Sequence, residues 1–413
     1  MRIAHIADIH IRNYKYHKEY KAAFEDLYVK LREQRVDLIC LLGDIAHTKT
    51  DISPEFVKMT SDLFIELGKI APMKIILGNH DLNCKAKARL DAITPIVDAL
   101  NDKNIELWKY SGIRKCGSYL NNDKTVLPVN FNVFSILDPE NWTRPESGAI
   151  NIALYHGSIS GCTVDNGWVM ENGDNNVECF EGHDLVLLGD IHKRQNMDKE
   201  GRIAYPGSLI QQNFAEDREK GFLVWNINSK DNIVSEFVPV KNIRPFINVS
   251  VENKALKCAK EDIRGARVRL VVNELLTTKE TQDLLSEIRE QLPESVVIQN
   301  NVGKLTGILD AEGRKIEKDD LAGTGVQNKF LEEFLSAHDV GDEKVQAVLE
   351  LNKKYNHLVA SSSPTTEQIQ WDIDKIEWNN FFNYGENNEI NFEDLNGIIG
   401  IFGKSYSGKS SVI

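Results

Sequence analysis

Five short apolar runs in the first half of the chain end directly, or one glycine, before acidic, amide or imidazole side chains. The runs read "RIAHIA", "DLICLL", "MKIIL", "NIALY" and "DLVLL" and alternate with helical stretches, which predicts an α/β layered fold. Further strands are predicted at "NVFSIL" (132–137), "GFLVWNI" and "VSEFVPV", and residues 17–35 are predicted to form a helix with an apolar stripe of Tyr20, Phe24, Leu27 and Leu31. Because open α/β sheets bind ligands beyond the carboxyl ends of their strands, the polar positions predict one shared site. These positions are Asp8 and His10, Asp44, Asn79 and His80, His156, and Asp190 and His192.

The residue types at these positions favour metal ligation. A single histidine after a strand is more often structural, so the recurrence of the pattern carries the interpretation. In an extended chain Asp8 and His10 point to the same face, because side chains alternate with a period of two. Mixed oxygen and nitrogen ligands suit Mn²⁺, Fe²⁺ or Zn²⁺ better than Ca²⁺ or Mg²⁺. The ligands are too many for one ion, so we expect two ions bridged by Asp44.

The motif set resembles that of the calcineurin-like metallophosphoesterases, which carry D-x-H, G-D, G-N-H-D or G-N-H-E, a single H and G-H-x-H. The match covers residues 1 to about 240 and implies an α/β fold of the four-layer sandwich type. By this resemblance one ion is held by Asp8, His10 and one of the pair Asp190 and His192. The second ion is held by Asn79, His156 and the other member of that pair.

The same resemblance implies two further roles. His80, next to the ligand Asn79, is expected to stabilise the transition state and to protonate the leaving oxygen, with Asp81 orienting its ring. Asp190 stands where the family usually has the first histidine of its last motif. A carboxylate still ligates metal there, but it adds negative charge and bears on the metal preference.

Within this superfamily the chain looks most like the SbcD-type nucleases, the meiotic-recombination-eleven class that processes DNA ends. His47 matches their GD-x-x-H form, and "AYPGSLIQQNF", from Ala204 to Phe214, resembles their Y-x-G-S segment. The resemblance implies a DNA exonuclease and endonuclease with two divalent ions, Mn²⁺ first and Mg²⁺, Fe²⁺ or Zn²⁺ as alternatives. The implied partners are DNA ends, an SMC-like coiled-coil ATPase and a second copy of the chain in a homodimer.

The remainder of the chain predicts smaller units. A strand, strand, helix, strand pattern predicts an α+β cap, and two later amphipathic helices share an apolar face too small for a core of its own. Such a face suggests docking on another protein, and the resemblance implies that this protein is the ATPase. The expected parts are the nuclease domain 1–242, the cap 243–302, a linker 303–326, the ATPase-binding helices 327–358, a linker 359–369 and the P-loop ATPase start 370–413.

The last segment carries a P-loop pattern after the apolar run "GIIGIF". It resembles the N-terminal start of an SbcC-type ATPase fused to the nuclease, although Tyr406 replaces the usual glycine. We expect ATP and Mg²⁺ to bind only if the rest of the ATPase is present, because Mg²⁺ also needs a Walker-B carboxylate. The expected phosphate-binding residues are Gly403, Gly408, Lys409 and Ser410.

Composition sets outer limits on location and partners. A net charge of −13 leaves phosphate binding to local basic stretches such as "RNYKYHKEYK", which a solvated helix face explains more simply. No apolar run reaches the roughly 18 residues of a membrane span, and no signal peptide is visible. We expect no membrane partner. The expected location is cytosol-like or the compartment that holds the DNA, the nucleoid or nucleus. Six cysteines without regular spacing are expected to be free thiols: Cys40, Cys84, Cys116, Cys162, Cys179 and Cys258.

Two alternatives stay open at this level. One is a generic phosphoesterase that acts on small phosphomonoesters or cyclic nucleotides, against which the cap and the P-loop argue. The other is a DNA-end scaffold in which the Asp190 site has lost turnover. Cleavage of duplex DNA ends with Mn²⁺, compared with cleavage of an aryl phosphate, separates the nuclease from the first alternative. DNA binding without cleavage indicates the second.

Overall fold

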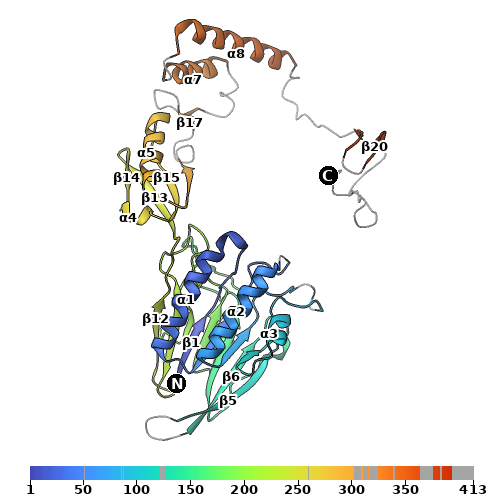
Figure 1. Cartoon of the computed structure of the whole chain (residues 1–413), viewed down its shortest axis with the longest axis vertical. Coiled ribbons are helices and arrows are strands. Elements are labelled where there is room, and N and C mark those ends of the chain that lie inside the picture. The colour runs from blue at the N-terminus through green and yellow to red at the C-terminus, as the bar shows by residue number, and fades with distance from the viewer. Residues whose placement is uncertain are drawn as a thin grey trace. The chain divides into compact units, whose positions relative to one another are not determined.

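The chain forms two compact units, Met1–Thr306 and Gly307–Ile413 (Figure 1). The first unit holds both the expected nuclease domain and the expected cap. No helix in the described part of the chain is both long and apolar enough to cross a bilayer. The computed structural model describes residues 1–50, 52–84, 86, 88–120, 126–258, 260–301, 308–309, 315–316, 324–337, 340–362, 375–381 and 384–392.

The first of two six-stranded sheets has the order β12-β11-β1-β2-β3-β4. Strands β1 to β4 run parallel, with Ile3 beside Leu38 and Ile39 beside Met73, while β11 pairs antiparallel with β1. The sequence predicts all of these strands except β4. Their bounds are β1 (Arg2–Ile6), β2 (Leu38–Leu42), β3 (Met73–Ile76), β4 (Ile105–Leu107), β11 (Gly221–Ile227) and β12 (Ile233–Pro239).

The second sheet has the order β5-β6-β7-β8-β10-β9. Its four central strands run parallel, and the edge strands β5 and β9 are antiparallel to their neighbours. The strand predicted over residues 132–137 is β6, which ends earlier because the Ser135 hydroxyl and N–H bond to Lys109 and Ser111 outside the ladder. The bounds are β5 (Gly112–Leu120), β6 (Val126–Phe134), β7 (Ile150–His156), β8 (Leu185–Gly189), β9 (Gln195–Asn196) and β10 (Ile203–Tyr205).

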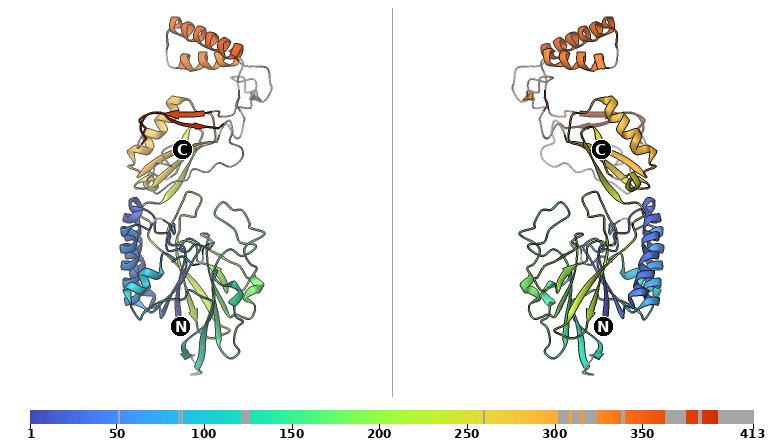
Figure 2. Two further views of the ribbon diagram at one scale, coloured as in Figure 1. Left: turned by 90° about the vertical axis from the view of Figure 1, so that its right-hand side faces the viewer. Right: turned by 90° about the vertical axis from the view of Figure 1, so that its left-hand side faces the viewer.

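Three helices cover the outer face of the first sheet: α1 (His17–Gln34), α2 (Pro54–Ile70) and α3 (Thr94–Leu100) (Figure 2). Helix α2 begins where the Ser53 hydroxyl accepts the Phe56 N–H, and Pro54 occupies its first turn. The apolar stripe predicted along α1 is buried, which confirms that it belongs to the core. The stripe consists of Tyr20, Phe24, Leu27 and Leu31.

Apolar cores lie between the helices and the first sheet, between the two sheets, and on the outer face of the second sheet. The outermost layer differs from a helical one: in the described residues it consists of loops and two 3₁₀ turns, η2 (Pro139–Asn141) and η3 (Val177–Phe180). Trp142 and Phe180 from this layer pack on Phe134 and Tyr155 of the sheet. Aromatic side chains therefore cover this face where no helix does.

The last part of the first unit is a four-stranded sheet of order β14-β13-β15-β16 with helix α5. The strand, strand, helix, strand order expected for the cap is present, with β14 and a short helix in addition. A capping box between Thr277 and Glu280 begins α5. The bounds are β13 (Phe246–Glu252), β14 (Ala255–Lys257), α4 (Lys260–Ile263), β15 (Arg267–Val272), α5 (Thr278–Glu290) and β16 (Ser295–Asn300).

The second unit contains the two helices expected from the sequence, α7 (Thr324–Ala337) and α8 (Asp342–Ser362). Asn352 of α8 donates a hydrogen bond of 2.8 Å to Asn328 of α7. The stretch expected as a linker contains β17 (Ile308–Leu309) and β18 (Lys315–Ile316), and β19 (Lys375–Trp378) pairs with β20 (Asn388–Asn391). The expected phosphate-binding residues 403–410 lie outside the described residues.

Candidate metal centre

The polar side chains singled out in the sequence gather where the carboxyl ends of strands from both sheets meet. Asp8 and His10 follow β1, and Asp44 follows β2. Asn79 and His80 follow β3, His156 is the last residue of β7, and Asp190 and His192 follow β8. The two sheets thus bring together residues that are up to 184 positions apart, from Asp8 to His192.

Four of these residues have a left-handed backbone conformation. The φ angles are 52° at Asp8, 48° at His10, 52° at Asp44 and 102° at Asp190. Residues other than glycine rarely adopt positive φ, and such conformations cluster at functional sites. The turns direct these side chains toward one another directly after the strands end.

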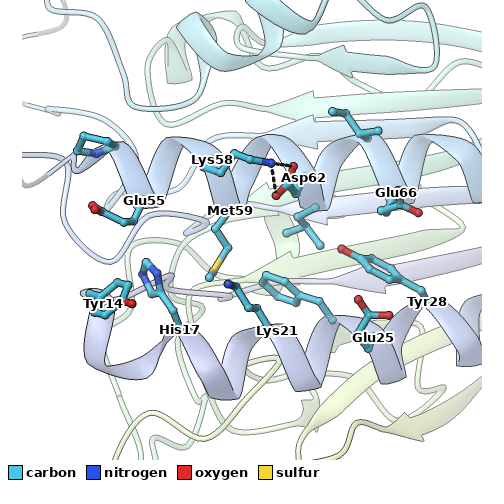
Figure 3. A pocket seen from close by; sticks show the side chains of 14 residues that line it. Tyr14, His17, Lys21, Glu25, Tyr28, Glu55, Lys58, Met59, Asp62 and Glu66 are labelled. Atoms are coloured by element: carbon cyan, nitrogen blue, oxygen red, sulfur yellow. Dashed lines mark hydrogen bonds and ion pairs between the residues drawn. The ribbon is translucent and has the colours of Figure 1, made fainter.

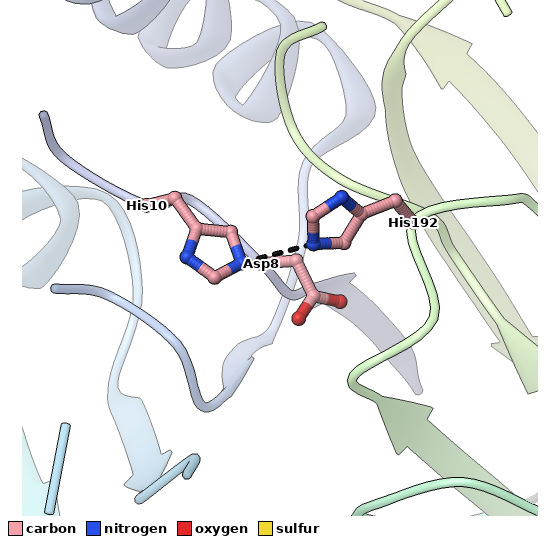
Figure 4. Close-up of side chains that lie close together, drawn as sticks. All are labelled: Asp8, His10 and His192. Carbon is pink, nitrogen blue, oxygen red and sulfur yellow. Dashed lines mark hydrogen bonds between the residues drawn. The ribbon is translucent and has the colours of Figure 1, made fainter. Parts of the chain in front are cut away.

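The first group consists of Asp8, His10 and His192 (Figure 4). The Nε2 atoms of His10 and His192 lie 2.9 Å apart, and Asp8 accepts the Asp190 N–H at 3.0 Å. Both rings therefore point the same nitrogen at one location beside a buried carboxylate. Of the pair that the sequence left open, His192 is the member that joins this group.

The second group consists of Asn79, His156 and Asp190. The Asn79 amide donates to Asp190 Oδ1 at 3.0 Å, and His156 Nε2 lies 3.8 Å from the same oxygen. Asp44 lies between the two groups: its Oδ1 is 3.3 Å from His156 Nε2, and its Oδ2 is 3.5 Å from His10 Nε2. This is the position expected of a bridging carboxylate.

The unsatisfied atoms of the cluster fit divalent cations. His156 Nδ1 donates to the Leu42 main-chain oxygen at 2.6 Å, so its Nε2 is the bare nitrogen, and that buried atom has no hydrogen-bond partner. Burial, together with the charges of Asp44 and Asp190, raises the pKa of Asp8 to about 7. A cation between these groups would give His156 Nε2 a ligand bond and would reduce the repulsion among the neighbouring carboxylates.

The imidazole of His156 fits only because three glycines surround it. A Cβ at Gly43 would lie 2.5 Å from His156 Nδ1, and one at Gly189 would lie 2.8 Å from the same atom. A Cβ at Gly78 would lie 2.7 Å from His156 Cε1 and 2.1 Å from Asp44 Oδ1. The glycines before Asp44, Asn79 and Asp190 therefore leave room for the ring.

His80 is exposed beside the cluster, and its ring is held differently from what the sequence predicts. Its Nδ1–H donates to the main-chain oxygen of His47 at 2.6 Å, and its main-chain N–H donates to Asp44 Oδ1 at 2.8 Å. Asp81 is buried and accepts the N–H groups of Ala46 and Gly78 instead. The expectation that Asp81 orients the His80 ring is wrong, because this carboxylate binds main-chain N–H groups of its own turn, at Gly78, and of the turn after β2, at Ala46.

Two cavities lie along the helical side of the first sheet. One, of about 440 Å³, reaches His47 and is lined by Arg12, Tyr14 and Tyr16 among others. The other, of about 760 Å³, lies between α1 and α2, with Tyr28 and Met59 in its walls (Figure 3). The linings of both cavities lack the candidate metal ligands, but the first cavity reaches His47, whose ring centroid lies 5.8 Å from that of His10. A third cavity, of about 200 Å³, is lined by the candidate ligand His192 together with Arg194 and Lys220.

The calcineurin-like phosphoesterase profile matches residues 1–208, which are 208 of the 413 residues and include every strand that ends in the cluster. The chain belongs to this family. Its members use divalent metal ions, and both groups of candidate ligand side chains lie within the matched residues.

Three relatives extend the comparison beyond the phosphoesterase region. An uncharacterized protein of Acanthamoeba polyphaga mimivirus is 30% identical over 100% of this chain, and the chain spans 31% of its length. One subunit of the nuclease SbcCD from Staphylococcus saprophyticus is 24% identical over 77% of this chain and 97% of its own length. The DNA double-strand break repair protein Mre11 of Archaeoglobus fulgidus is 21% identical over 62% of this chain and 60% of its own length.

One buried carboxylate of this phosphoesterase escaped the sequence analysis. Glu216 accepts a hydrogen bond of 2.9 Å from His192 Nδ1. Burial would raise the pKa of Glu216, but its contacts with His192 and Lys220 lower it to about 2. Glu216 follows the "AYPGSLIQQNF" segment by two residues, and no strand-end motif marks it, so the sequence alone offered no signal for it.

Proposed function

We propose that this phosphoesterase is a metal-dependent DNA nuclease with exonuclease and endonuclease activity that processes DNA ends. One observation carries the proposal: ligand side chains from strands of both sheets converge in two groups, and Asp44 lies between them within 3.5 Å of both. This arrangement suits two divalent ions, which in such sites stabilise the attacking and leaving oxygens of an in-line displacement at phosphorus.

In this proposal Asp8, His10 and His192 hold one ion, and Asn79, His156 and Asp190 hold the other, with Asp44 shared. Mn²⁺ is our first choice, because nitrogen and oxygen donors are mixed in both groups. The metals together supply Lewis acidity and an activated water at neutral pH. The remaining chemistry is left to side chains around the cluster.

His80 is the proposed proton donor to the leaving oxygen. Its Nδ1–H is engaged by the His47 carbonyl, so Nε2 is the atom available to exchange a proton with substrate. The ring of His80 lies 4.8 Å, centroid to centroid, from that of His10. A leaving group bound at the first metal group is therefore within reach of His80. His47, which fixes the ring through its backbone, is proposed to influence exonuclease cleavage.

DNA as substrate rests on the likeness to a nuclease subunit and to a double-strand break repair protein, together with the surroundings of the cluster. The cavity at His47 holds Arg12 and two tyrosines, and the His47 ring lies 5.8 Å, centroid to centroid, from that of the proposed ligand His10. This suits a nucleotide chain better than a small phosphomonoester. We propose an SMC-like ATPase, in cis or in trans, and a second copy of this chain as partners. Phe334, 57% exposed on α7, and Leu351, 51% exposed on α8, would contribute to the ATPase contact.

The deciding experiment compares substrates on one protein preparation. Linear duplex DNA labelled at either end, covalently closed single-stranded circles and an aryl phosphate are each incubated with Mn²⁺ or with EDTA. We expect Mn²⁺-dependent shortening of the duplex from an end and nicking of the circles. Turnover of the aryl phosphate alone would replace the proposal with a small-phosphoester phosphatase. DNA binding without cleavage would replace it with an end-binding scaffold.

A further inference from the structure

Glu216 lies beneath the candidate metal centre, and its carboxylate accepts hydrogen bonds on both oxygens. Its side chain is 0% exposed. Oε2 accepts the Ser208 hydroxyl at 2.9 Å and the Gln212 N–H at 3.0 Å, and it lies 2.9 Å from Lys220 Nζ. Oε1 accepts His192 Nδ1–H at 2.9 Å and the Asn213 amide at 3.1 Å. A carboxylate with five such partners stays ionised and has one stable orientation, although a carboxylate oxygen of Asp165 lies within 4.8 Å of it.

This contact determines which nitrogen of His192 is bare. A carboxylate can only accept, so Nδ1 carries a proton, and in the neutral ring Nε2, 2.9 Å from His10 Nε2, is the atom that keeps its lone pair. The Lys220 ammonium donates to the His192 main-chain oxygen at 2.9 Å, which fixes the backbone of the same residue. Both the ring and the backbone of His192 are therefore held from one side.

The other two ligand histidines lack such support. His156 donates Nδ1–H to a main-chain oxygen, that of Leu42, and the buried Nδ1 of His10 has no hydrogen-bond partner. A neutral carbonyl orients a ring but raises its basicity less than a carboxylate does. Of the three rings, His192 alone is backed by a full negative charge.

We propose that Glu216 is a positioning residue that sets the tautomer and basicity of His192 and thereby the affinity of the first metal group. The inference rests on the proposed two-ion centre and adds a residue that lies outside the 1–208 family match. Glu216 touches neither substrate nor reacting atoms. It acts through His192, and Lys220 keeps its charge compensated.

The test is the metal affinity of Glu216→Gln, measured with Mn²⁺ alone by titration calorimetry and by the Mn²⁺ EPR signal. An amide turned with its NH₂ toward His192 forces the proton onto Nε2, and an amide turned the other way faces its NH₂ toward Lys220. We expect affinity to fall about 10- to 100-fold at one of two sites, while the other site is unchanged. Glu219→Gln removes an equal charge from a side chain that is 66% exposed and should bind both ions like the wild type.

Further variants separate positioning from folding. Lys220 is 4% exposed, so removing only its partner leaves a buried charge, and Glu216→Gln combined with Lys220→Met avoids this. We expect the double variant to melt near the wild type without metal and still to bind one ion weakly. Glu216→Asp should recover part of the affinity. The inference would be overturned if a folded Glu216→Gln or double variant bound Mn²⁺ at both sites with wild-type affinity. Failure of the wild type to bind two ions would instead refute the proposed centre.

Discussion

The two groups of the candidate metal centre are built from similar residues but are supported differently. The first group has two imidazoles and one carboxylate, and a buried carboxylate, Glu216, backs His192. The second has one imidazole, one amide and one carboxylate, and the main-chain oxygen of Leu42 backs His156. In the first group a charged side chain therefore orients the imidazole of His192. In the second, a main-chain oxygen and the space left by three glycines orient the imidazole of His156.

Asp190 changes the electrostatic balance between the groups. With histidine at this position, as is usual in the family, the second group would have no charge of its own beyond the shared Asp44. With aspartate, each group contributes one carboxylate in addition to Asp44. Burial raises the pKa of Asp190, although the nearby His156 opposes this. A cation close to Asp190 would favour its charged form and so lower the pKa again.

The largest effect is expected from removing the residue that the two groups share. Asp44→Ala deletes the oxygens near both His10 and His156, so both ions should be lost and DNA cleavage should fall to background. Metal content after gel filtration and DNA cleavage with Mn²⁺ measure the two losses. The control is Asp62→Ala, which removes an exposed carboxylate on α2. One tightly bound ion remaining in Asp44→Ala would show that Asp44 belongs to a single group.

Removing the proton donor should affect chemistry and leave both groups intact. In His80→Ala every proposed ligand stays, so we expect cleavage to fall by about 10²- to 10⁴-fold with unchanged Mn²⁺ affinity. His183→Ala removes an imidazole that bonds to Phe180 and serves as the control. Metal loss in His80→Ala as large as that in Asp44→Ala would contradict the division between ligands and proton donor.

The pH dependence of stability tests the buried charge of the first group. Burial raises the pKa of Asp8 to about 7 from its ordinary 3.8 in the metal-free chain. Between these values the folded chain holds a proton that the unfolded chain has released, so the free energy of unfolding falls as pH rises from about 4 to 7. Each pKa unit corresponds to about 1.4 kcal/mol, so the decrease in the free energy of unfolding between pH 4 and 7 should be smaller by a few kcal/mol in Asp8→Asn.

Urea unfolding in EDTA at several pH values measures this effect. Mn²⁺ should restore the stability of the wild type at pH 7, and it should do so less well for Asp8→Asn, which lacks the ligand charge. Asp91→Asn provides a matched control on an acid whose pKa is lowered by hydrogen bonds with Lys109 and Thr94, against the effect of burial. A wild-type slope that persists unchanged in Asp8→Asn would assign the pH dependence to other groups.

The smallest effect is expected from restoring the family's usual residue in the second group. Asp190→His replaces an oxygen ligand by nitrogen, so the preference for Mn²⁺ over Zn²⁺ should shift toward Zn²⁺ by on the order of tenfold, with cleavage retained. Competition titrations with the two metals measure the shift. Full Mn²⁺-dependent cleavage and affinity in Asp190→Ala would mean that Asp190 is not a ligand.

Local sequence predicted most of the strands around the site and the helix on its outer side. The runs before Asp8, Asp44, Asn79 and His156 are strands because apolar β-branched segments bounded by polar turns have few other stable conformations. The edge strands β4, β5 and β9 were missed, since their residues are more polar and long-range pairing decides their state. The role predicted for Asp81 failed because adjacent residues in a turn point in different directions.

The sequence by itself determined that the first half of the chain has an α/β fold with candidate metal ligands at its strand ends, because strand periodicity and residue chemistry act over a few neighbouring residues. The motifs at those strand ends also carry the resemblance to the phosphoesterases. Only the tertiary structure decided that His192 joins Asp8 and His10, that Asp190 joins Asn79 and His156, and that Glu216 supports one of these groups. These pairings join residues that are between 24 and 184 positions apart. Their geometry depends on how the two sheets pack and how each turn leaves its strand, which no local pattern specifies.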